Sequence, residues 1–242
     1  MLVIFDLDDT LIDTLSVQIA ARERIMRHFA LEPSNAAMDR WQRAAQFFDP
    51  EDFAHVLPLV IPGLHSPVVD VEDLRRLYWA CEVENITLKP GVAALLRRLE
   101  ELGTAMALVT GGPREVQERK VKRLGLEKYF ARGAIVYSDG PRHPRSPNPA
   151  PLRQALRLCA VDPAAAYHVG DRLSDVIAAH LARVRSVLVN APSLAADPPA
   201  ADIALDIETP LHTIDHIVDL LSIVVPAPAR RQHGDRLHAG AV

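Results

Sequence analysis

Cysteine is scarce in this sequence, and long apolar runs are missing from it. The chain has 242 residues and two cysteines, Cys81 and Cys159, whose separation fits no metal-binding or redox motif. We therefore expect reduced thiols in a cytoplasmic protein. No apolar run is long enough to cross a bilayer, and no basic segment followed by an apolar one precedes the first predicted strand. The sequence thus predicts neither a membrane span nor a signal peptide.

Positive charge is not in excess either. The net charge of −4 gives no electrostatic reason to expect a nucleic acid or an anionic membrane surface as a partner. Hydrophobic residues make up 49% of the chain and charged residues 24%, which is typical of a globular protein. A chain of this length fits one large domain, or a core with an insertion.

The opening stretch, residues 2–11 (LVIFDLDDTL), is an apolar run that ends in carboxylates and a threonine. Such a run predicts a buried strand that delivers polar groups to the carboxyl edge of a parallel sheet. Asp6 and Asp8 are two residues apart, so a strand continuing that far would direct both to one face. Because two adjacent carboxylates repel, a shared proton or a bound cation must neutralise them. The alternative is a plain strand followed by an acidic turn.

Strands and helices alternate through much of the chain. Apolar strands at about 105–109 and 166–169, each followed by a helix, predict an α/β fold with a doubly wound parallel sheet. The helix at 113–124 is rich in charge, so most of its surface should be solvated. We expect a final helix at about 209–223 and a disordered tail at 226–242.

Residues 15–85 contain no segment that looks like a buried parallel strand. Their periodicity and proline punctuation favour several helices. A parallel sheet normally brings in its next strand after one crossover helix, so this stretch predicts a separate helical domain. The core domain would then comprise residues 1–14 and 86–225. The alternative is that the helices form one flank of a single domain.

Two further motifs follow apolar strands. They are Val109-Thr110-Gly111 and residues 169–175 (VGDRLSD). Together with the Asp-x-Asp-x-Thr of residues 6–10, they resemble the second, fourth and first signatures of the haloacid dehalogenase (HAD) superfamily, in the family's order. The resemblance covers about residues 1–222. It implies a Rossmann-like core, and the insertion at 15–85 resembles the small helical cap of many members.

The resemblance also implies roles for the carboxylates. Asp6 would be the nucleophile that forms an aspartyl-phosphate, and Asp8 would protonate the leaving oxygen and then activate water. Asp6, the backbone carbonyl of Asp8, and Asp171 would hold Mg²⁺, with Asp175 supporting the site.

Thr110 fits a hydroxyl that contacts phosphate, and the amides of Gly111 and Gly112 can donate to phosphate oxygens at a helix N-terminus. A plain strand-to-helix turn is the alternative for these three residues.

The third family signature differs in this chain. Relatives carry a lysine, sometimes an arginine, that bridges the nucleophile and the phosphate before a Pro-x-Pro segment. Here Ser146 precedes Pro147-Asn148-Pro149, and its hydroxyl carries no charge. Arg145 or Arg142 is near enough in sequence to replace the lysine.

The sequence therefore predicts a Mg²⁺-dependent phosphatase acting on a small phosphorylated metabolite. One alternative is a catalytically weak or silent relative that binds a phosphorylated ligand or a protein partner, as Ser146 suggests. Another is a phosphomutase, which would use the same intermediate.

Overall fold

A parallel sheet forms the centre of the protein. The computed structural model describes residues 1–29, 31–44, 52–61, 70–130, 133–138, 147–189 and 211–225. Within these ranges the sheet has six strands in the order β3-β2-β1-β4-β5-β6, and every pairing is parallel. The strands are β1 (Leu2–Phe5), β2 (Ala105–Gly111), β3 (Ile135–Ser138), β4 (Ala166–Gly170), β5 (Arg185–Val189) and β6 (Leu211–Ile214).

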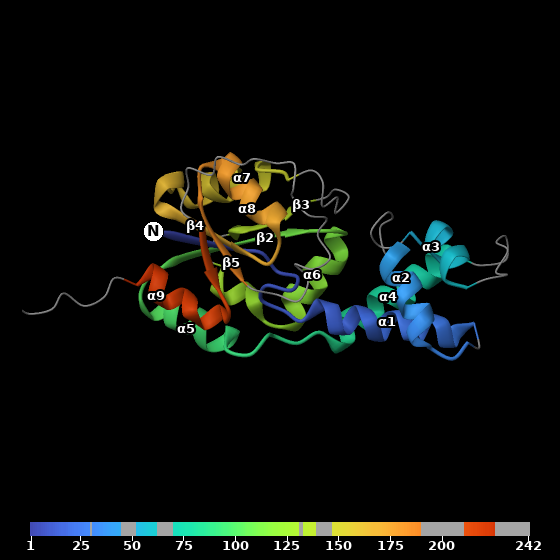
Figure 1. Cartoon of the computed structure of the whole chain (residues 1–242). Coiled ribbons are helices and arrows are strands. Elements are labelled where there is room, and N and C mark those ends of the chain that lie inside the picture. The colour runs from blue at the N-terminus through green and yellow to red at the C-terminus, as the bar shows by residue number, and fades with distance from the viewer. Residues whose placement is uncertain are drawn as a thin grey trace, which may run out of the picture.

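Helices cover both faces of this sheet (Figure 1). Because side chains alternate along a strand, β1 supplies two cores. Val3 and Phe5 belong to the core on the face covered by α5 and α9, whereas Leu2 and Ile4 belong to the core under α7 and α8. The helices of this part of the chain are α5 (Val92–Glu101), α6 (Arg114–Arg123), η1 (Leu126–Tyr129), α7 (Ala150–Cys159), η3 (Pro163–Ala165), α8 (Leu173–Ala182), η5 (Ile217–Asp219) and α9 (Leu220–Val224).

The strand order reverses direction at β1. From β1 the chain builds outward through β2 and β3, and then returns to place β4 on the other side of β1. In open parallel sheets, ligands bind beyond the carboxyl ends of the strands at such a switch point. Asp6 follows β1 and Asp171 follows β4, so the fold carries both motifs to this place. The prediction of a doubly wound α/β fold is confirmed.

In the described residues between β1 and α5, four α-helices form a second body with its own apolar core. We refer to α1 (Thr14–His28), α2 (Asn35–Ala44), α3 (Phe53–Val60) and α4 (Val71–Asn85) as the helical unit. It lies beside the sheet, to the right in Figure 1. Its core is built around the buried rings of Trp41, Phe53 and Tyr78, which meet edge to face with centroids 6.3 and 5.7 Å apart. The described part of residues 15–85 is thus helical and contains no strand.

The expected final helix at 209–223 is wrong in its first half. Residues 211–214 form β6, which pairs with β5 so that Ser186 faces Leu211 and Val189 faces Ile214. Helical structure starts only at η5 and continues as α9. The apolar spacing fitted a helix equally well, but pairing with the open edge of β5 decided the conformation. The expected tail at 226–242 lies outside the described residues.

His168 is a buried histidine inside β4. Its side chain is 4% exposed, and its Nδ1 atom lies 3.2 Å from the carbonyl oxygen of Ile4. Because a carbonyl oxygen only accepts, Nδ1 carries the hydrogen and donates it to Ile4. Burial lowers the pKa of His168 from 6.5 to about 4. Because the unfolded chain binds the proton more readily than the folded chain, stability present above pH 6.5 is lost as the pH falls towards 4.

We expect the free energy of unfolding to fall by about 3 kcal/mol between pH 7 and pH 4 because of His168 alone. Urea unfolding of the wild type and of His168→Gln across this range measures the difference. His28→Gln, at an exposed histidine, serves as the control. Parallel pH curves for the wild type and His168→Gln would contradict the prediction.

Candidate active site

Three carboxylates meet at the switch point of the sheet. Oxygen atoms of Asp6, Asp171 and Asp175 all lie within 4.8 Å of one another, and we call these residues the acidic cluster. Asp6 is fixed to β4 by its backbone N–H, which donates to the carbonyl oxygen of Val169 at 2.9 Å. Asp171 follows β4, and Asp175 lies in the first turn of α8. The two residues predicted to hold a metal through their carboxylates, Asp6 and Asp171, are therefore brought together with Asp175, the residue predicted to support the site.

Neighbouring groups orient the acidic cluster. The hydroxyl of Thr10 donates to Oδ1 of Asp171 at 3.3 Å, and both residues are buried. Oδ2 of Asp175 accepts from the backbone N–H of Arg172 at 3.1 Å, so the same carboxylate caps the start of α8. The threonine of the opening motif thus supports the aspartate that follows β4.

Electrostatics favour a cation in the acidic cluster. Burial raises the pKa of Asp6 well above its usual value, and the charges of Asp175, Asp171 and Asp8 raise it further. A bound cation would relieve this repulsion. Clustered carboxylate oxygens are the ligands preferred by Mg²⁺, so the donor set fits such a hard divalent ion.

The side chain of Asp8 takes a different direction from the acidic cluster. Its Oδ1 accepts from the hydroxyl of Thr14 at 2.6 Å and from Nζ of Lys120 at 2.9 Å. Its Oδ2 accepts from Nε2 of Gln117 at 2.8 Å. Both oxygens are therefore held by donors from the start of α1 and from α6.

Lys120 and Gln117 are site residues that the sequence interpretation missed. The outer face of α6 is exposed, as its charge predicts, but Lys120 and Gln117 are fully buried. Lys120 also pairs with Oε2 of Glu82 on α4 at 3.2 Å. A signal was present, because Val116 and Val121 mark the inner face of the helix, and positions 117 and 120 share that face.

Thr110, the last residue but one of β2, carries an unsatisfied polar group. Its hydroxyl is buried and has no hydrogen-bond partner among the described residues. Gly112 follows with φ of +112°, a conformation that favours glycine, and the carbonyl oxygen of Gly111 accepts from Nε2 of Gln117 at 2.7 Å. A buried hydroxyl without a partner suits a ligand that brings acceptor oxygens. Ser146 and the two candidate arginines, Arg145 and Arg142, lie outside the described residues.

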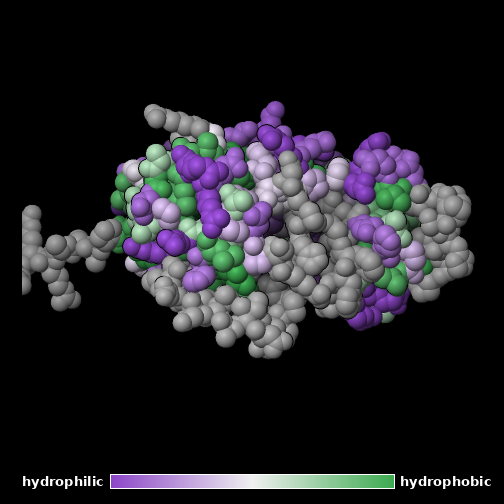
Figure 2. Space-filling view, turned by 90° about the horizontal axis from the view of Figure 1, so that it is seen from above, coloured by the Kyte–Doolittle hydropathy of each residue, from purple (hydrophilic) through white to green (hydrophobic). Residues whose placement is uncertain are grey.

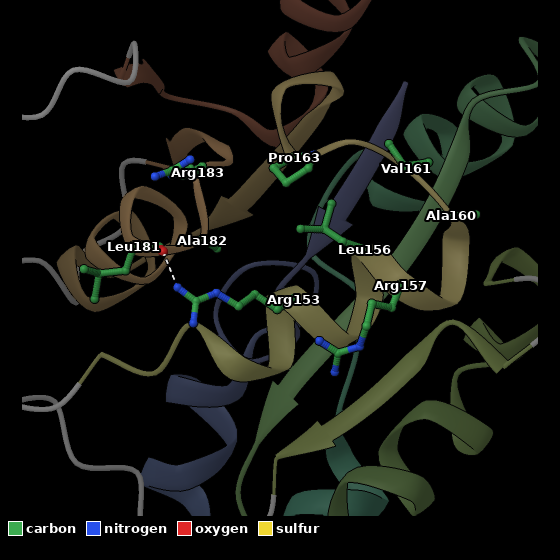
Figure 3. A pocket seen from close by; sticks show the side chains of 9 residues that line it. All are labelled: Arg153, Leu156, Arg157, Ala160, Val161, Pro163, Leu181, Ala182 and Arg183. Atoms are coloured by element: carbon green, nitrogen blue, oxygen red, sulfur yellow. Dashed lines mark hydrogen bonds between the residues drawn. The ribbon is translucent and has the colours of Figure 1, made fainter.

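A pocket of about 590 Å³ between α7 and α8 does not belong to this site (Figure 3). Arg153, Arg157 and Arg183 line it, and the last turns of α7 and α8, which form much of its wall, lead back to the starts of β4 and β5. Because the six described strands are parallel, the pocket lies at the sheet edge opposite the acidic cluster. A guanidinium nitrogen of Arg153 donates to the carbonyl oxygen of Leu181 at 2.7 Å, and such carbonyls at a helix C-terminus attract cations. Hydrophilic and apolar residues are interspersed on this side of the molecule (Figure 2).

Comparison with known proteins identifies the family. The family model of haloacid dehalogenase-like hydrolases matches residues 1–183. The chain belongs to this family. It is 29% identical over 185 residues to the pyrophosphatase PpaX of Bacillus velezensis, covering 73% of this chain and 76% of that protein. It is 31% identical over 194 residues to a phosphoglycolate phosphatase of Pseudomonas putida, covering 77% and 68%.

Solved structures give the same fold. A HAD-superfamily hydrolase of subfamily IA from Geobacter sulfurreducens superposes with a TM-score of 0.65 at 22% identity, over 92% of this chain and 95% of that one. The predicted resemblance to this HAD superfamily and its doubly wound core is confirmed. In the described part of this HAD hydrolase, no helix has the length and apolar character needed to cross a membrane.

Gly170 allows Asp175 to approach β4 in this HAD hydrolase. A Cβ atom added at Gly170 would lie 2.6 Å from Cβ of Asp175, which is closer than two carbon atoms can pack. We expect Gly170→Ala to displace Asp175 and to weaken Mg²⁺ binding about 10- to 100-fold, as for other groups that support metal ligands. Isothermal titration calorimetry measures the affinity.

The control for this change is Gly103→Ala. Gly103 has φ of +66° and nothing within 4 Å of an added Cβ, so its substitution strains the backbone away from the site. Equal Mg²⁺ affinity for Gly170→Ala and the wild type would show that Asp175 does not support the cation.

Proposed function

We propose that this HAD hydrolase is a Mg²⁺-dependent phosphatase that hydrolyses a small phosphorylated metabolite through an aspartyl-phosphate on Asp6. One observation carries the proposal: Asp6 lies in the acidic cluster, at the carboxyl end of the strand beside the switch point, while the side chain of Asp8 is held apart from it. A nucleophile and a proton-transferring group need such separate environments.

The carboxylates of Asp6 and Asp171, with the backbone carbonyl of Asp8, are the proposed ligands of Mg²⁺, and Asp175 supports them. When bound, the ion would offset the negative charge that these groups and a phosphate bring together. Its presence would also lower the basicity of the Asp6 carboxylate and keep it ionised for attack.

Asp6 then acts as the nucleophile in the first half-reaction. A carboxylate oxygen of Asp6 bonds to phosphorus as the bond from phosphorus to the ester oxygen breaks. Asp8 gives its proton to that leaving oxygen. In the second half-reaction Asp8 takes a proton from water, the water oxygen attacks phosphorus, and inorganic phosphate leaves Asp6 as a free carboxylate.

Thr110 and the amides of Gly111 and Gly112 are the proposed phosphate contacts. The unpaired buried hydroxyl of Thr110 supports this assignment, because a phosphate oxygen would satisfy it. The turn after β2 leads into α6, whose N-terminus favours negative charge.

We further propose that the helical unit is a cap, residues 15–85, over a core of residues 1–14 and 86–225. Its separate apolar core supports this division, and Glu82 of α4 reaches the Lys120 that contacts Asp8. A cap of this kind would exclude water during phosphoryl transfer. The relatives named as phosphatases of phosphoglycolate and pyrophosphate agree with a small substrate.

Ser146 supports one alternative, a catalytically weak or silent relative. A hydroxyl at the usual lysine position carries no charge to stabilise the phosphoryl group. Losing one such well-placed group typically costs about 10²–10³ in rate. Arg145 and Arg142 remain the sequence candidates for a replacement.

Asp6→Asn should reduce hydrolysis by at least about 10³-fold, because an amide is a poor nucleophile and a poor ligand for Mg²⁺. The measurement is phosphate release from phosphoglycolate, glyceraldehyde 3-phosphate, glucose 6-phosphate and p-nitrophenyl phosphate, with and without Mg²⁺.

Asp162→Asn is the matched control, because Asp162 is exposed and an asparagine oxygen can still accept from the backbone N–H of Ala164. Turnover by Asp6→Asn at the wild-type rate would assign the nucleophile elsewhere. A wild type that hydrolyses none of the esters would favour the silent alternative.

Small esters should be better substrates than a folded phosphoprotein, because a cap that closes over Asp6 leaves no room for a protein surface. Comparing kcat/KM for the best small ester and for a phosphoserine-containing protein tests this expectation. Equal values for the two substrates would argue against the cap.

A further inference from the structure

A buried lysine joins the two bodies of the protein at the active site. Nζ of Lys120 lies 2.9 Å from Oδ1 of Asp8 in the core and 3.2 Å from Oε2 of Glu82 on α4. The side chain of Lys120 has no exposed surface, and that of Glu82 is 2% exposed. One cation therefore lies between two carboxylates in a place from which water is almost excluded.

Stability alone gives little reason for this arrangement. Removing the charges of a lysine and a glutamate from water is costly, and well-packed apolar residues often stabilise a protein at least as well. The other inward-facing residues of α6 include Val116 and Val121, so apolar packing is available on this face. The contact with Asp8 instead suggests that the buried charge of Lys120 serves the active site.

Gln117 reinforces the hold on Asp8 from the same helix. Its Nε2 donates both to Oδ2 of Asp8 at 2.8 Å and to the carbonyl oxygen of Gly111 at 2.7 Å. Lys120 and Gln117 thus bind opposite oxygens of one carboxylate. The carbonyl oxygen of Gly111, at the end of β2, holds the Gln117 side chain in place. A carboxylate held at both oxygens has its plane and direction defined.

We propose that Lys120 is a positioning residue for Asp8, anchored from the helical unit by Glu82 and assisted by Gln117. This inference rests on the proposed function, in which Asp8 transfers protons. Lys120 keeps the Asp8 carboxylate beside the acidic cluster instead of among its cation ligands. Without Lys120, the Asp8 side chain is free to turn towards the cation, where it cannot serve the leaving oxygen.

The test compares two leaving groups. An alkoxide needs a proton as it leaves, whereas p-nitrophenolate leaves without one, so a misplaced Asp8 affects the two esters unequally. Lys120→Met should lower kcat/KM for the best alkyl phosphate of the panel by about 10²-fold. The comparison uses kcat/KM because it reports formation of the aspartyl-phosphate, whereas hydrolysis of that intermediate also needs Asp8 and is the same step for both esters. For p-nitrophenyl phosphate the loss should stay below about tenfold.

Two further variants keep the test decisive if Lys120→Met does not fold. The first is a double variant in which Glu82→Gln is added to Lys120→Met, so that no unpaired carboxylate charge remains on α4. Gln117→Leu weakens the hold on Asp8 without changing any charge. Both should show the same unequal loss between the two esters. Lys122→Met and Glu84→Gln, at exposed positions of the same two helices, should leave both rates unchanged.

Equal loss on both esters would overturn the proposal and would assign Lys120 either to the charge of the phosphoryl group or to stability alone. Unchanged rates would overturn it as well. If the wild type hydrolyses neither ester, the proposed function fails, and a crystal structure of the double variant tests the positioning role separately. We expect the Asp8 carboxylate to leave its contact with Gln117 in that structure, and an unmoved carboxylate would refute the inference.

Discussion

Repulsion among buried carboxylates is the constraint on which the rest of the site depends. Asp6 is surrounded by the charges of Asp171, Asp175 and Asp8, and burial removes the water that would screen them. A fold that places such groups together must supply compensation. The donors around each carboxylate supply part of it, and a hard cation bound by the acidic cluster would supply the remainder.

The compensation is divided between the two parts of the site. Thr10 and the amide of Arg172 donate to the acidic cluster as neutral groups, and the half-buried guanidinium of Arg172 lies 3.9 Å from Oδ2 of Asp171. Asp8 contacts the fully buried ammonium group of Lys120 at 2.9 Å. Neighbouring carboxylates thereby acquire different environments, and different environments allow different chemical roles.

Much of this site could be predicted from the sequence, because strand ends in a parallel sheet converge on one edge. Asp6 and Asp171 follow apolar strands, and this was enough to bring them together. Lys120 and Gln117 could not be identified in that way. Val116 and Val121 mark the inner face of α6 on which both residues lie, but the pattern does not show what that face meets. The contact with Asp8 depends on how α6 packs beside β2 and α4.

The fold was predictable to a similar degree. Alternating apolar strands and helices defined the doubly wound sheet, since that periodicity is a property of each segment. The assignment of residues 211–214 failed because the edge of β5 was open to another strand, a fact that belongs to the whole sheet. Local pattern and tertiary context agreed for β1 and disagreed for β6.

The buried pair of Lys120 and Glu82 also limits how freely the helical unit can be exchanged. A body inserted in a single stretch after β1 looks modular, as if another set of helices could be grafted in its place. Such a graft would leave the ammonium group of Lys120 facing one carboxylate instead of two, unless the incoming helix carried an acid at the equivalent point. The residue at position 82 of the helical unit and the residue at position 120 of α6 have therefore to change together, so each part of the protein limits which sequences the other can adopt.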